Sequence, residues 1–227
     1  MTRRLTIPWP DAPAFAGRGG APIRLLAASD EADPALDHER NRSQLGAIDA
    51  VIGCGDLPAD YLAFLSDAFR APLVRVLGNH DRLEVDAETG VLVAEPVQAG
   101  VVRVCPVPII GLSWPGSPPR RSELTAWRQS LGLALAGSRG RRPSIIASHI
   151  PPGGAGDVAA DGYHRGSPAY RWLLDRLRPP LWLHGHTPLA GVAAWNLDHG
   201  GSRVVNVTGS VLVELVPVRP GGAPTRT

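Results

Sequence analysis

The sequence predicts an α/β fold in which a largely parallel sheet in the first half of the chain is followed by a β-richer second half. Two observations predict it. Short apolar runs alternate with segments of helical spacing over residues 23–78, and from residue 191 onward the chain reads as consecutive strands without helices. Continuous apolar runs separated by helices are typical of parallel strands buried on both faces. We expect the later strands to form a second sheet.

In the first half, the run "IRLLAAS" at 23–29 predicts a strand and is followed by a polar helical stretch near 34–46. "DAVIGCGD" at 49–56 and "PLVRVLG" at 72–78 predict two more strands. A helix is expected between them because apolar residues recur near helical spacing, namely Leu57, Tyr61, Phe64, Leu65 and Phe69.

The second half combines two expected helices with a longer series of strands. The helices are expected at 121–136 and 167–178, and the strands at "GVVRVCPV", "PIIGLSW", "SIIASH", "LWLHGH", "GVAAWNL", "RVVNVTG" and "VLVELVPV". Residues 1–21 and 218–227 are rich in Pro and Gly and lack a pattern. We therefore expect two poorly ordered tails around a single domain over 22–217.

Composition excludes several classes of protein. With 227 residues, 44% hydrophobic and 19% charged, the chain is long enough for one sizeable soluble domain. No apolar run approaches a membrane helix, the N-terminus does not read as a secretory signal, and two cysteines are too few for a disulfide framework, so a cytoplasmic location is expected. All 23 basic residues are arginine, which rules out a catalytic lysine. P-loop and serine-hydrolase motifs are also missing.

Charge gives little sign of a nucleic-acid partner, although it does not exclude one. The net charge is only +2. The basic stretches "PPRR" at 118–121 and "SRGRR" at 138–142 are expected to be solvated loops, although their arginines could flank a cleft in a nuclease. The sequence does not indicate an oligomeric state.

Polar residues suited to metals or proton transfer follow the C-terminal ends of successive expected strands. In order, they are Asp30, Asp56, the stretch Asn79-His80-Asp81, His149, and the pair His184 and His186. In open α/β sheets, ligands collect at the carboxyl ends of strands, where the loops converge. Each residue alone has a structural explanation, such as a helix N-cap for an aspartate or a turn for "GNHD". Together they form a mixed oxygen and nitrogen set that suits Mn, Fe, Zn or Co.

These residues, read as Asp30, "GD" at 55–56, "GNHD" at 78–81, His149 and "GH" at 185–186, resemble the calcineurin-like metallophosphoesterase superfamily. The resemblance spans roughly residues 23–216, and "SDEADPAL", "CGDLPADYL", "HRG" and "LHGH" look like a microbial subgroup of that superfamily. It implies a sandwich of two mixed β-sheets flanked by helices.

The resemblance also implies roles for single residues. Asp56 would bridge two metals, and Asn79, His149 and His186 would complete one of the two sites. His80 would donate a proton to the leaving alkoxide or contact a phosphate oxygen, with Asp81 holding its ring. A metal-bound hydroxide would attack the phosphorus of a small-molecule phosphomonoester or phosphodiester.

At the other metal site the chain departs from the family pattern. Ala32 and Pro188 stand where the family usually has histidines, which leaves Asp30 and Asp56. Any of Glu31, Asp33, His38 and His184 could substitute, and the sequence does not choose among them. A hard ion that tolerates water ligands would fit this site better than Zn. One or two divalent ions are therefore expected, with Mn first and Fe, Zn, Mg or Co as alternatives.

Two further questions stay open at this stage. The departures at 32 and 188 also allow a phosphoesterase-fold scaffold without catalysis, as in a trafficking-coat subunit of the superfamily, although the intact "GNHD" argues against it. Substrate selectivity is expected in 113–142 and 161–170, where His164 and Arg165 could hold a phosphate or merely sit on the entry loop of a helix. The tryptophans, including Trp114, are expected to be buried packing.

Overall fold

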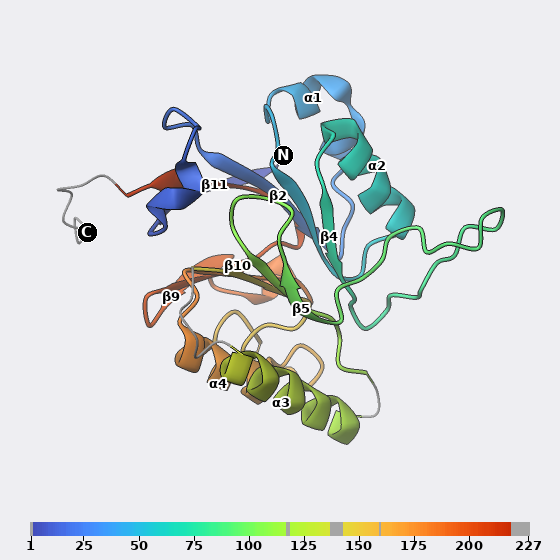
Figure 1. Ribbon diagram of the computed structural model, residues 1–227. Coiled ribbons are helices and arrows are strands. Elements are labelled where there is room, and N and C mark those ends of the chain that lie inside the picture. The colour runs from blue at the N-terminus through green and yellow to red at the C-terminus, as the bar shows by residue number, and fades with distance from the viewer. Residues whose placement is uncertain (1, 117–118, 137–142, 159, 219–227) are drawn as a thin grey trace.

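Two β-sheets lie face to face in the computed structural model, and helices cover the outer side of each (Figure 1). The structure describes residues 2–116, 119–136, 143–158 and 160–218, with the side chains of 119–121 excepted. The predicted α/β fold of two mixed sheets flanked by helices is confirmed. Among the helices in these ranges, none is long and apolar enough to cross a membrane.

The first sheet is five-stranded and has the order β1-β11-β2-β3-β4. Its strands are β1 (Arg3–Trp9), β11 (Gly209–Pro217), β2 (Ile23–Ser29), β3 (Ala50–Cys54) and β4 (Leu73–Val76). Strands β2, β3 and β4 run parallel, as predicted, whereas β11 is antiparallel to β2. The connections carry η2 (Pro34–Asp37), α1 (Glu39–Ser43) and α2 (Ala59–Phe69).

The second sheet is six-stranded and has the order β5-β6-β7-β8-β10-β9. Its strands are β5 (Ala99–Val102), β6 (Ile109–Leu112), β7 (Ile145–Ser148), β8 (Leu181–His184), β10 (Ser202–Asn206) and β9 (Asn196–His199), with α3 (Pro119–Ala136) and α4 (Pro168–Leu177) on its outer face. The predicted strand at 191–197 is wrong in its first part, because η3 (Leu189–Gly191) precedes it and pairing begins only at Asn196.

The main core lies between the two sheets. Alternate residues of the central strands point into it, such as Leu25 and Ile52 from one sheet and Ile145 and Leu183 from the other. The intervening residues, Leu26 among them, pack beneath the helices. Burial on both faces explains why these strands appear in the sequence as unbroken apolar runs. Because the central strands of both sheets run parallel, their carboxyl ends and the loops that follow them meet at one edge.

The expected N-terminal tail is wrong. Residues 3–9 form β1, which pairs in parallel with β11, and η1 (Ala12–Phe15) follows it. Ile7 and Trp9 are buried, with Trp9 fully inaccessible. The physical reason is that β1 is held by β11, a strand at the other end of the chain, which local sequence does not reveal. Nearby prolines also obscure the alternation of apolar and polar residues along β1. On the C-terminal side Val218 is exposed, and the rest of the predicted tail lies outside the described residues.

Trp9→Ala is expected to lower the free energy of unfolding by about 3 kcal/mol, because it removes a fully buried indole and leaves a cavity between the sheets. Urea denaturation of the full chain measures the change. Val101→Ala, at a position where the valine is 45% exposed, is the control and is expected to change little. An equal effect of the two substitutions would show that β1 does not contribute to the core.

Candidate metal centre

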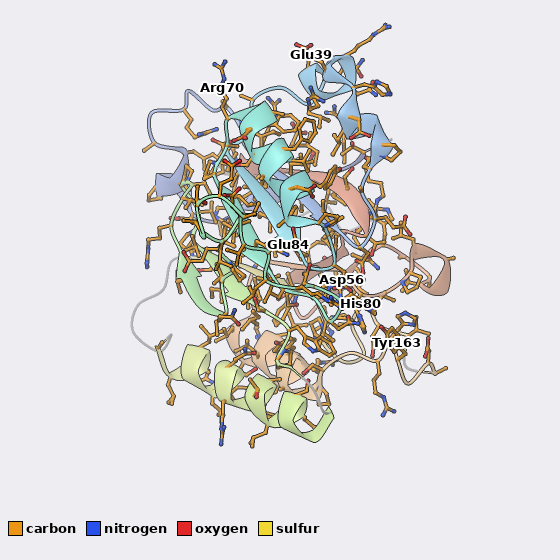
Figure 2. All side chains as sticks on the ribbon, turned by 90° about the vertical axis from the view of Figure 1, so that its right-hand side faces the viewer. Glu39, Asp56, Arg70, His80, Glu84 and Tyr163 are labelled. Atoms are coloured by element: carbon orange, nitrogen blue, oxygen red, sulfur yellow. The ribbon has the colours of Figure 1, made fainter. Side chains whose placement is uncertain are left out.

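The strand-end residues predicted from the sequence come together where the two sheets meet. Asp30 and Asp56 follow β2 and β3 of the first sheet, and His149 follows β7 of the second. One ligand atom from each of these three side chains lies within 4.8 Å of the other two. Figure 2 shows Asp56 and His80 next to each other on this side of the molecule. Both sheets therefore contribute to one group of metal-ligating side chains.

The backbone at this group adopts an uncommon conformation. Positive φ angles occur at Asp30 (61°), Asp56 (56°) and His186 (66°). The other non-glycine residues with positive φ in the described chain, Arg70 and Arg178, are C-caps of α2 and α4, where this conformation is ordinary. Left-handed backbone at residues other than glycine costs free energy and gathers at functional sites. Its presence at three predicted ligands singles out these strand ends.

His149 brings the acceptors of two other residues together. Its Nδ1 donates to the carbonyl oxygen of Cys54 at 2.9 Å, which turns Nε2 toward Asp56 Oδ2 at 3.2 Å and Asn79 Oδ1 at 2.9 Å. A neutral imidazole in this tautomer would face two oxygens with a lone pair, so a cation between these atoms stabilises the arrangement. Either a proton or a metal ion supplies one. The group therefore fits a divalent metal.

The protonated form shows how strongly this place favours positive charge. Burial opposes the imidazolium of His149, but the hydrogen bond and charge of Asp56, together with the charge of Asp30, outweigh it and raise its pKa. For Asp56, burial is likewise outweighed by His149 and the His80 amide, so that the pKa of its carboxyl is lowered. The Asp56 carboxylate therefore remains charged where a metal would be held.

Asp30 is fixed by the loop that carries His186. The amide of His186 donates to both carboxylate oxygens, at 3.2 and 3.0 Å, and the Thr208 hydroxyl donates to Oδ2 at 3.1 Å. A Cβ at Gly185 would lie 1.9 Å from Ser29 Oγ and 2.4 Å from Asp30 Oδ2, so only glycine permits this approach. The "GH" pair therefore allows the loop after β8 to approach Asp30 at the end of β2.

His186 lies beside the group rather than within its tightest part. Its ring centroid is 4.9 Å from that of His149. Nε2 donates to the Tyr163 carbonyl at 2.9 Å, which leaves Nδ1 as the nitrogen that could bind a metal. Burial, followed by the charge of His149, lowers the pKa of His186.

Asp81 does not have the role that the resemblance implied. Its Oδ2 accepts hydrogen bonds from the amides of Asp56 at 2.8 Å and Gly78 at 2.7 Å, and its Oδ1 accepts one from Arg75 at 3.1 Å. These bonds tie together the loops after β3 and β4 instead of orienting the ring of His80. A Cβ at Gly78 would lie 2.1 Å from Asp56 Oδ1, so the two loops are in close contact. Arg75, which the sequence analysis did not single out, belongs to this support.

His80 points toward a residue that the sequence analysis missed. Its amide donates to Asp56 Oδ1 at 2.8 Å, and its Nε2 lies 2.7 Å from the hydroxyl oxygen of Tyr163. The same oxygen accepts a hydrogen bond from Asn79 Nδ2 at 2.8 Å. Figure 2 shows Tyr163 beside His80. Tyr163 lies within the segment 161–170 that was expected to govern substrate selectivity, but no sequence motif singles it out.

The structure separates the four candidates for the ligand missing at Ala32. Asp33 accepts hydrogen bonds from Thr2, the amide of Ala35 and Ser210, so it serves the N-terminal strand. His38 is exposed at the start of α1. His184 is fully buried, which lowers its pKa to about 4. Glu31 lines a cavity of about 170 Å³ together with Asp30 and Asp56, and is therefore best placed of the four.

The two predicted phosphate-binding residues line different cavities, both of which are also lined by Tyr163. His164 hydrogen-bonds Asp161 and lines the 170 Å³ cavity. Arg165 lines a neighbouring cavity of about 590 Å³. Trp114 lines this cavity too and lies against the site, with its ring centroid 6.0 Å from that of His186. Trp114 is partly buried and packs against the core of the second sheet, as expected, and it also lines this cavity.

Comparison with known proteins gives one family and several similar folds. The family model of calcineurin-like phosphoesterases matches residues 33–190. GAP50 of Plasmodium is 15% identical with a TM-score of 0.52, covering 83% of this chain and 72% of its own. The phosphopantetheinyl hydrolase of Mycobacterium tuberculosis is 15% identical with a TM-score of 0.46, covering 90% and 99%. Vps29 of Cryptosporidium parvum is 15% identical with a TM-score of 0.42, covering 83% and 75%. No curated protein sequence matches.

Proposed function

Because this chain belongs to the calcineurin-like phosphoesterase family, we propose that it is a metal-dependent hydrolase of phosphomonoesters or phosphodiesters. The observation that carries the proposal is that His149 Nε2 lies 2.9 Å from Asn79 Oδ1 and 3.2 Å from Asp56 Oδ2, an arrangement that a cation held between these atoms would stabilise. Asp30, Glu31 and His186 surround these atoms in the same cavity or beside it. Mn²⁺ suits such a mixed set, and Fe, Zn, Mg and Co are the alternatives.

The residues that would hold the metal are Asp30, Asp56, Asn79, His149 and His186, with Glu31 in the place left by Ala32. Divalent ions bound there would polarise the phosphoryl group and neutralise its charge. The chain itself would contribute two donors at the rim. Asn79 Nδ2 and His80 Nε2 converge on one oxygen at 2.8 and 2.7 Å, which is the geometry needed to bind a phosphoryl oxygen or protonate a leaving oxygen.

The test is metal analysis of the purified protein combined with turnover of p-nitrophenyl phosphate and bis(p-nitrophenyl) phosphate. We expect Mn²⁺-stimulated release of nitrophenol. Turnover that is absent on both substrates, with less than one metal bound per chain, would overturn the proposal.

His80→Ala is expected to reduce kcat by about 100-fold while the metal content stays unchanged, because it removes a proton donor but no metal ligand. His199→Ala is the matched control, since His199 lies on β9 and bonds Asp175 far along the sheet. Activity that survives both His80→Ala and Asn79→Ala would contradict the roles assigned to them.

A binding role without turnover is the second candidate, favoured by the departures from the family pattern at Ala32 and Pro188. Pro188 lines the 170 Å³ cavity and offers no metal ligand. This candidate predicts a folded protein that binds less than one metal ion and turns over neither substrate. The same metal analysis therefore separates the two candidates.

A further inference from the structure

Two cavities meet at the side chain of Tyr163. The 170 Å³ cavity contains the proposed metal ligands, and the 590 Å³ cavity opens beside it. Asn79, Tyr163 and His186 line both. A molecule whose phosphoryl group reaches the metal ligands therefore has the larger cavity directly next to it, on the other side of the phenol.

The Tyr163 hydroxyl occupies the place of a substrate oxygen. Its oxygen lies within hydrogen-bond distance of Asn79 Nδ2 and His80 Nε2, and no substrate atom could use these two groups while the hydroxyl is there. Tyr163 is 56% exposed, so moving its ring into solvent exposes little additional apolar surface. The hydroxyl thus marks a position that an oxygen of the phosphoester group can occupy.

The larger cavity is built to receive an apolar ring. Its wall combines the indole of Trp114 with Pro115, Ala126 and Ile150, and the charged groups of Glu123 and Arg165 lie at other points of it. The Trp114 amide donates to the Leu77 carbonyl at 2.7 Å, which fixes the tryptophan to the end of β4. A volume of about 590 Å³ matches the organic part of a medium-sized ligand and greatly exceeds that of a phosphate.

We propose that the substrate is a phosphoester whose organic group carries an aromatic ring, which lies in the 590 Å³ cavity against Trp114 while an oxygen of the phosphoester group replaces the Tyr163 hydroxyl. This inference rests on the proposed function. In the reaction, the oxygen of a water molecule bonds to phosphorus and the water releases one proton to solvent. The bond between phosphorus and the ester oxygen breaks, that oxygen takes a proton from His80, and His80 regains a proton from solvent. The released product is an alcohol or phenol bearing the ring.

Equilibrium binding of two phosphonates to the Mn²⁺-loaded full chain tests the inference, since a phosphonate has no ester bond to break. Isothermal titration calorimetry is expected to give a Kd for 1-naphthylphosphonate at least tenfold lower than for methylphosphonate. Gly162→Leu places an apolar side chain at the wall of the cavity and is expected to remove most of this advantage. Tyr163→Phe is expected to tighten the binding of both phosphonates, because it removes the two hydrogen bonds that hold the phenol in the site.

Gly132→Leu is the matched control. Neither Gly162 nor Gly132 has a positive φ, a Cβ at either meets no atom within 4 Å, and Gly132 lies on α3 outside the cavity. The naphthyl advantage is expected to persist in this variant. Trp114→Leu adds a second test, with an expected loss of at least fivefold for the naphthyl compound relative to the methyl compound.

The outcomes distinguish this inference from the proposed function. Turnover of phosphoesters with equal Kd values for the two phosphonates overturns the inference and leaves the proposed function in place. Naphthyl binding that depends on Gly162 and Trp114, without turnover of any aryl phosphate, supports the cavity assignment and overturns the proposed function. If the tighter binding of the naphthyl compound persists in both Gly162→Leu and Trp114→Leu, the claim that this cavity binds the aromatic ring is overturned.

Discussion

Asp56→Ala is expected to reduce phosphoester turnover by about 1,000-fold or more, and bound Mn²⁺ to less than one ion per chain. The carboxylate faces His149 Nε2 through one oxygen and accepts the His80 amide through the other, so it joins the residues of both sheets. The substitution removes a proposed metal ligand. It also removes the acceptor of the His80 amide, which holds the proposed proton donor in place. Loss of several kcal/mol of transition-state stabilisation corresponds to an effect of roughly this size.

The measurement compares kcat/KM and metal content in Asp56→Ala, Asp56→Asn and a control. Asp56→Asn keeps the shape but removes the charge, and is expected to lose metal as well. Asp175→Asn is the control, because Asp175 is a half-exposed aspartate of α4 that bonds Arg171 and His199 and does not line the 170 Å³ cavity. Full metal content in Asp56→Ala would mean that the ion binds elsewhere.

The grouping of Asp30, Asp56 and His149 could be predicted from the sequence because their positions follow from a local rule. Each lies directly after an apolar run, and parallel strands bring their carboxyl ends to one edge. This rule places Asp30, Asp56 and His149 together, as the structure does. It says nothing of which oxygen or nitrogen each group presents. The tautomer of His149 is set by a hydrogen bond to the Cys54 carbonyl. This is a tertiary contact, so the tautomer could not be predicted from the sequence.

Tyr163 and the N-terminal strand show where prediction from sequence failed. Tyr163 lies in a loop without a repeating pattern, and its hydroxyl meets Asn79 and His80 across more than eighty positions of sequence. Strand β1 pairs with β11, from the opposite end of the chain, and neither strand reveals its partner. Both failures concern contacts between distant segments, which local periodicity cannot encode. The role of Asp81 beside His80 was implied by the family resemblance, whereas the structure pairs Asp81 with Arg75 and with the amides of Asp56 and Gly78.

Asp81→Ala is expected to lower the free energy of unfolding by about 4 kcal/mol, because it leaves the guanidinium of Arg75 buried without its counter-charge. The two side chains are only 5% and 1% exposed. Two nitrogens of Arg75, Nε and Nη1, have no hydrogen-bond partner among the described residues. The buried charge of the guanidinium is therefore balanced by Asp81. The substitution also leaves the amides of Asp56 and Gly78 unpaired, which adds to the cost.

A double-mutant cycle with Arg75→Met separates the ion pair from the amide bonds. Arg75→Met alone leaves the Asp81 carboxylate with its two amide donors, and is expected to cost about 2 kcal/mol. In the double variant no buried charge remains, so its loss is expected to be smaller than the sum of the two single losses by about 2 kcal/mol. Urea denaturation of the four proteins gives the coupling. Strict additivity would show that the charge of Arg75 is balanced by another group.

Asp81 ties the loop of Asp56 to that of Asn79 through the amides of Asp56 and Gly78. Metal affinity is therefore expected to be reduced in Asp81→Ala, and to stay reduced in the double variant even where stability recovers.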